Sequence, residues 1–162
     1  MTAVFTLCMA SLVVLCMPVR ANAITKHVFY VSSSDGHVRE VYNNNGWHTD
    51  DLTADTNGPT TGGTAQITGF FDGSSEHVFY ISSSDLHVRE LYFFNGAWHG
   101  YDLTADTNGP GIVPVSPLTS YFGGHIDHVF YINYVEGDVH ELFFNDNWHD
   151  IDLTSGTYSP SA

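Results

Sequence analysis

The sequence predicts an all-β protein whose sheets are β-propeller blades of four antiparallel strands, with about two and a half to three blades per chain. The chain repeats itself at spacings of 50 and 51 residues, with units that begin at His27, His77 and His128. The first two units share 26 identities in 33 aligned pairs when Ala97 is set aside as an insertion. A period near 50 residues fits a propeller blade.

Within each repeat, short runs rich in Val, Phe, Tyr and Ile are separated by turn clusters such as Ser-Ser-Ser-Asp and Thr-Asn-Gly-Pro. None of these apolar runs has the length or the period of a helix. We expect three strands, in order: the His-Val-Phe-Tyr run, a run ending in Glu-x-aromatic, and Trp-His-x-x-Asp-Leu-Thr. A looser strand near 67–71 or 118–122 then completes the period of four.

Residues 1–23 differ from the rest of the chain. A nearly continuous apolar run from Ala3 to Val19 is followed by Arg20 and by Ala21-Asn22-Ala23, which matches the cleavage pattern of a secretory signal peptide. Both cysteines, Cys8 and Cys16, lie within this run. We therefore expect a secreted, extracellular protein, with an uncleaved anchor helix as the alternative. The repeats would then occupy 24–76, 77–127 and 128–162, and the first would lack its innermost strand.

The composition excludes several function classes. The chain holds 18 Asp and Glu against 4 Lys and Arg, and it is 43% hydrophobic. Such a chain folds, and it lacks the basic clusters that nucleic acid requires. It shows no nucleophile elbow, phosphate loop or zinc-protease motif, so we expect neither an enzyme nor a cofactor.

Fewer than four blades do not close a ring. We therefore expect copies of the chain to associate as a homo-oligomer that completes the propeller. The alternative is a truncated fragment of a larger propeller that exposes its edges.

A glutamate and a tryptophan recur at fixed positions in all three repeats. A buried carboxylate needs hydrogen-bond donors, which sugar hydroxyls supply, and an indole ring can lie against a pyranose. Phenylalanine stands at a second aromatic position in two repeats. The candidate carbohydrate-binding residues are Glu40, Glu90, Glu141, Trp47, Trp98, Trp148, Phe93 and Phe144. The alternative is that these residues only hold the blades together, in a structural or protein-interaction module.

Strand alternation places the neighbours of the repeated glutamates on the opposite face. Arg39, Arg89 and His140 should therefore face the other cleft of each blade, where they could donate to a ligand from the neighbouring blade. The histidines that open the repeats are placed one per blade, so their spacing does not assemble a three-histidine metal site. We expect no metal there.

The pattern resembles the fucose-specific lectins of fungal type, which are six-bladed propellers with bacterial relatives. The resemblance runs from His27 to Thr157, through the Val-Phe-Tyr strand, the Glu-x-aromatic strand, the Asn-Gly turn and the following tryptophan. It implies neutral, fucosylated glycans as partners, bound between blades by the repeated glutamates and tryptophans. The family also binds its sugar through an arginine on the first of these strands, two residues before the tyrosine. This chain differs there, because the equivalent residues are Val28, Val78 and Val129.

Overall fold

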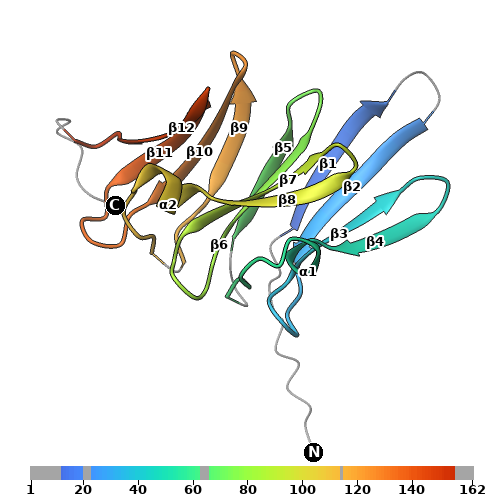
Figure 1. Cartoon of the computed structure of the whole chain (residues 1–162), viewed down its shortest axis with the longest axis horizontal. Helices are drawn as coiled ribbons and strands as arrows, with labels where there is room; N and C mark the ends of the chain where they lie inside the picture. The colour runs from blue at the N-terminus through green and yellow to red at the C-terminus, as the bar shows by residue number, and fades with distance from the viewer. Residues whose placement is uncertain (1–11, 20–22, 63–65, 114, 156–162) are drawn as a thin grey trace, which may run out of the picture.

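The computed structural model describes residues 12–19, 23–62, 66–113 and 115–155, and these form three four-stranded antiparallel sheets (Figure 1). The all-β prediction is confirmed. The first sheet contains β1 (Leu12–Val19), β2 (Ala23–Val31), β3 (Val38–Asn43) and β4 (Trp47–Asp51). The second contains β5 (Ile67–Phe71), β6 (Glu76–Ile81), β7 (Val88–Phe94) and β8 (Ala97–Asp102). The third contains β9 (Thr119–Gly123), β10 (Ile126–Ile132), β11 (Val139–Asn145) and β12 (Asn147–Asp152).

The three sheets stand side by side like neighbouring propeller blades and do not close into a ring (Figure 1). Strand β5 contacts both β1 and β9, so the first strands of the three sheets line the same side. Each of these strands precedes the His-Val-Phe-Tyr strand of its blade along the chain. As a result, β5 lies within residues 24–76 of the sequence repeat but pairs with β6 of the second blade.

Strand β1 lies in the segment for which we predict a removable leader. It pairs with β2 along its whole length, from Leu12 opposite Tyr30 to Val19 opposite Ala23. In the full chain this segment supplies hydrogen-bonding partners for the otherwise free edge of β2. That the first repeat of a mature chain without residues 1–23 lacks its innermost strand stays a prediction. Cleavage of the leader stays a prediction. Within the described ranges, no helix is long and apolar enough to cross a bilayer.

Two short helices, α1 (Leu52–Asp55) and α2 (Leu103–Thr107), follow the outer strands of the first and second blades. Their N-caps are Asp51 and Asp102, whose carboxylates accept hydrogen bonds from the helix backbone at 3.1 and 3.0 Å. The sequence analysis missed these helices because about one turn is too short to show a helical period. Each helix buries its leucine fully against the neighbouring strands.

The hydrophobic core consists of two clusters, one between each pair of neighbouring blades. Each cluster joins one face of a blade to the opposite face of the next, as face-to-face packing of sheets requires. The first cluster contains Phe29, Val31, Val38, Leu52, Ile67, Val78, Tyr80 and Leu91. The second contains Phe70, Phe79, Ile81, Val88, Leu103, Ile112, Leu118, Val129, Tyr131 and Leu142.

The two outermost faces of the stack repeat the residues of the packed faces but are less buried. On the third blade, Phe130 is partly exposed and Leu153 is 37% exposed, whereas the equivalent Phe79 and Leu103 are at 0%. On the first blade, Val41 is partly exposed, although its equivalents in the other blades are fully buried. The end faces are thus copies of the two surfaces that pack against each other inside the chain.

Candidate functional site

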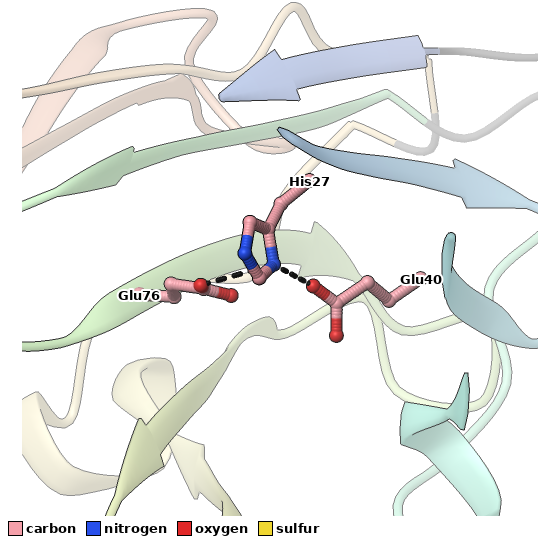
Figure 2. Close-up of side chains that lie close together, drawn as sticks. All are labelled: His27, Glu40 and Glu76. Atoms are coloured by element: carbon pink, nitrogen blue, oxygen red, sulfur yellow. Dashed lines mark hydrogen bonds and ion pairs between the residues drawn. The ribbon is translucent and has the colours of Figure 1, made fainter. Parts of the chain in front are cut away.

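Each cleft between two blades contains a histidine flanked by two carboxylates. In the first cleft, Nδ1 of His27 contacts the carboxylate of Glu40 and lies 3.1 Å from Oε1 of Glu76 (Figure 2). We call His27, Glu40 and Glu76 the first triad. Each triad takes its histidine and one acid from one blade, and its second acid from the next.

The second cleft repeats this arrangement at equivalent positions. Nδ1 of His77 lies 2.7 Å from Oε1 of Glu90 and 4.0 Å from Oδ2 of Asp127. We call these three residues the second triad.

The strand register explains how these side chains meet. Phe29 lies opposite Glu40 in the β2–β3 ladder, and His27 stands two residues earlier on the same face. Adjacent strand residues point to opposite faces, so Glu76 reaches back into the first cleft while His77 faces the second. The adjacent residues Glu76 and His77 of β6 therefore belong to two different clefts.

The triads are buried, and burial shifts the pKa of their carboxyls. Glu40 is 3% and Glu90 4% exposed. Burial raises the pKa of both carboxyls and that of Asp127, and contact with the histidines only partly offsets this effect. Burial alone would lower the pKa of His27, but hydrogen bonds to Glu40 and Glu76 raise it to about 9.

In metal-free buffer, we expect the free energy of unfolding to fall as the pH rises from about 6.5 to about 9.5. The raised pKa of His27 means that its stabilising contribution is complete below pH 6.5 and is lost as the pH rises through about 9. Deprotonation leaves two buried carboxylates without a cation. Urea denaturation over this pH range measures the slope, and His27→Gln should flatten it. A wild-type stability that stays constant or increases would contradict the expectation.

The second cleft opens into a cavity of about 490 Å³ between the second and third blades. Its wall combines the buried second triad with aromatic rings from both blades and polar groups of the β11–β12 turn. The lining residues are His77, Glu90, Tyr92, Tyr101, Asp106, Asp127, Phe144, Asp146, Asn147 and Trp148. The cavity thus combines polar groups with aromatic rings, a composition typical of sites for small polar ligands.

The structure brings three of the predicted site residues together in this cavity. Glu90 belongs to the second blade, whereas Phe144 and Trp148 come from the third. The ring of Trp148 packs edge-on against Phe79, with centroids 6.1 Å apart, and against Phe144 at 5.6 Å. The glutamate of one repeat therefore shares a site with the aromatic residues of the next repeat.

The first cleft repeats the aromatic arrangement. Trp98 of the second blade packs edge-on against Phe29, with centroids 5.9 Å apart, and against Phe93 at 5.5 Å. Phe29 lies opposite Glu40 in the strand ladder, so this aromatic pair belongs to the cleft of the first triad.

The end faces hold incomplete versions of the same site. Glu141 pairs with Nδ1 of His128 at 2.5 Å, but the described chain has no following blade to supply the remaining groups. At the other end, Trp47 is 63% exposed because no blade packs against it. The third glutamate and the first tryptophan therefore each lie in an incomplete cleft at one end of the stack.

The arginines and the histidine on the opposite face do not reach a triad. Arg39 is bonded to Asp35 and Asp51, and Arg89 to Asp85 and Asp102, all within the same blade. His140 likewise lies 3.0 Å from Asp150. Since Asp51 and Asp102 also cap the two helices, the two arginines stabilise the turn after the outer strand. The structure places neither the arginines nor His140 as donors in a neighbouring cleft.

The sequence analysis missed the histidines and the second acids of the triads. The recurrence of His27 and His77 was visible, but their position on the face of the glutamate depends on the strand register. The second acid was harder to find because it precedes the histidine of the following repeat. Glu76 and Asp127 are equivalent in the alignment, and this recurrence of an acid before the histidine was the available signal.

Comparisons with known proteins identify the fold. No family model matches the chain, and no curated protein is detectably similar to it in sequence. The structure is similar to the fucose-specific lectin of Aleuria aurantia, which is described as a six-bladed β-propeller, with a TM-score of 0.64 and 13% identity. That match covers 93% of this chain and 46% of the lectin, so the chain spans about half its length.

A fucose lectin from Kordia zhangzhouensis, solved in complex with methyl-fucoside, is also similar. Its TM-score is 0.62 at 18% identity, and the match covers 90% of this chain and 99% of that one. A mercury derivative of the Aleuria lectin is similar with a TM-score of 0.65 and 12% identity, and the match covers 93% of this chain and 46% of that one. At these identities the comparisons establish a β-propeller fold that is shared with lectins.

Proposed function

We propose that this protein is a secreted, non-catalytic lectin that binds a neutral sugar in the clefts between its blades, with fucose as the leading candidate. The observation that carries the proposal is the cavity between the second and third blades, where Glu90 lies among Phe144, Trp148 and two tyrosines. The fold is that of solved fucose lectins, which supports this class of ligand.

The chemistry of the cavity suits a monosaccharide. Sugar hydroxyls would donate to the carboxylates of the triad, and an N–H of the His77 imidazole would donate to a ring or hydroxyl oxygen. The apolar face of the sugar would lie against the aromatic rings that line the cavity. A volume of about 490 Å³ is within the range of small-molecule sites.

Repetition favours binding over catalysis. The glutamate recurs once per blade, whereas glycoside hydrolysis requires one unique pair of carboxyls set across a single bond. Several similar sites on one molecule give avidity for surfaces that display many sugars.

Titration calorimetry with methyl-fucoside and a panel of neutral monosaccharides tests the proposal. We expect heat for at least one sugar, and a loss of affinity of at least about tenfold in Glu90→Gln, because an amide accepts hydrogen bonds more weakly than a carboxylate. Glu136→Gln, which alters an exposed acid on the third blade, is the matched control and should bind normally.

Absence of heat for every sugar, from a protein shown to be folded, would overturn the lectin proposal. If Glu90→Gln instead lowers the melting temperature and leaves sugar binding intact, the triad is structural and the sugar binds without Glu90.

We further infer that a second copy of the chain completes the ring. The exposed face of the third blade and that of the first are equivalent to surfaces that pack together inside the chain. Two copies joined head to tail at both ends would give six blades, the number described for the Aleuria lectin. Glu141 of one copy would then face Trp47 of the partner subunit.

A further inference from the structure

The triads carry more negative charge than the protein neutralises. Each contains two carboxylates and one histidine in a buried cleft. The chain has only four Lys and Arg residues, and both Arg39 and Arg89 are committed to aspartates outside the triads. Burying uncompensated carboxylates is costly, so a cation at these positions would be strongly favoured.

The second triad contains a carboxylate without a hydrogen bond. Asp127 is 8% exposed, and among the residues that the structure describes its carboxylate accepts no hydrogen bond. It faces Nδ1 of His77 at 4.0 Å, a separation too long for a direct hydrogen bond. A carboxylate that is largely buried, faces His77 and accepts no hydrogen bond is available as a metal ligand.

We propose that each triad binds one divalent transition-metal ion, with zinc as the representative metal. One imidazole nitrogen and two carboxylate oxygens form a ligand set that Zn²⁺ accepts, and a fourth position would remain for water or a ligand hydroxyl. The proposal rests on the packing of blades within one chain and does not depend on sugar binding.

The triad distances fit this geometry. Ligand atoms about 2.0–2.2 Å from a tetrahedral zinc lie about 3.3 Å from one another. The nitrogen–oxygen separation to Glu76 in the first triad is 3.1 Å, and the separations to Glu90 and Asp127 in the second are 2.7 and 4.0 Å. The two separations of the second triad bracket the required spacing, and the ligand atoms of each triad all lie within 4.8 Å of one another, so adjustments of side chains would seat the ion.

This grouping differs from the one that the sequence analysis rejected. The histidines that open the repeats do lie in separate blades, but each gathers two acids of its own cleft. A third cluster, Asp85, His87 and Asp102, has the same residue types, yet Arg89 already bonds both of its aspartates and would repel a metal ion.

The number of sites follows from the repeat. The position that supplies Glu76 and Asp127 in two repeats is Lys26 in the first. A second copy placed after the third blade would therefore bring a lysine to His128 and Glu141 in place of a third ligand. We expect metal only in the two clefts within the chain.

Zinc stoichiometry tests the proposal. The full chain is stripped with a chelator, loaded with Zn²⁺, desalted and measured by plasma mass spectrometry, and we expect about two ions per chain. Glu76→Gln and Asp127→Asn should each retain about one, and the double variant almost none. Glu136→Gln, with an exposed acid changed in the same way, should match the wild type.

A second readout guards against loss of folding. Zinc should raise the melting temperature of the wild type and of Glu136→Gln, but not that of the double variant, since a ligand stabilises only the fold that binds it. The proposal is overturned if the wild type retains no zinc after desalting, or if the double variant retains as much as the wild type through other histidines.

Discussion

Replacing Phe79 by alanine is expected to lower the free energy of unfolding by about 3–5 kcal/mol. Phe79 is fully buried between the second and third blades, where it packs against Phe70 at 5.5 Å and against the edge of Trp148 at 6.1 Å. Its removal leaves a cavity that the two rigid sheets cannot close, so the lost contacts are not recovered. Urea denaturation followed by tryptophan fluorescence measures the change.

Phe130→Ala is the matched control. Phe130 occupies the same position in the third repeat but lies on the end face, where it is only partly buried. In dilute solution, where copies are separate, we expect Phe130→Ala to lower the free energy of unfolding by less than about half as much as Phe79→Ala does, because the substitution removes less buried apolar surface. Equal costs in the two variants would mean that the end face is covered by something other than solvent.

The propeller fold could be predicted from the sequence because the repeat of about 50 residues and the pattern of four strands both indicate a propeller blade. Ile67–Phe71, a loose apolar run, forms β5 within the range expected for the fourth strand. Alternation correctly separated Glu40 from Arg39, since only the glutamate reaches a triad. Local periodicity determines which face a side chain occupies, and the repeats confirmed it independently.

The composition of the site could be predicted only in part. Glu90, Phe144 and Trp148 were identified, yet their meeting across two blades depends on how one sheet packs on the next. The second acid of each triad stands outside the strand that carries the glutamate and outside its repeat. Contacts between blades do not appear as a periodic pattern within one repeat. The sequence therefore predicted only a hydrogen bond at the strand end for His77.

The N-terminal segment shows a different limit of sequence reasoning. An apolar run of this length fits a secretory leader and also fits a buried strand, because both require the same residue types. In the full chain, Leu12–Val19 pairs with β2. Edge pairing is a property of the assembled sheet, and nothing in the run itself distinguishes the two roles.

The second large effect concerns assembly: Val41→Glu is expected to weaken the association of two copies by at least about a thousandfold. Val41 is partly exposed on the end face of the first blade, and its equivalents Leu91 and Leu142 are buried between blades. In a closed ring of two copies, the substitution would place an unpaired carboxylate in both junctions. Sedimentation velocity should give the mass of two chains for the wild type and of one for the variant.

Val135→Glu is the control, because Val135 is 76% exposed in the loop between β10 and β11, outside the strands that form the end faces, and its substitution should leave the dimer intact. A wild type that sediments as one chain at every concentration would contradict ring closure between copies. A heterogeneous aggregate would favour a truncated propeller with unprotected faces. A discrete dimer is the expected result because a head-to-tail contact closes only when its rotation matches the ring, and here the contact would repeat the blade-to-blade rotation already present twice within each chain.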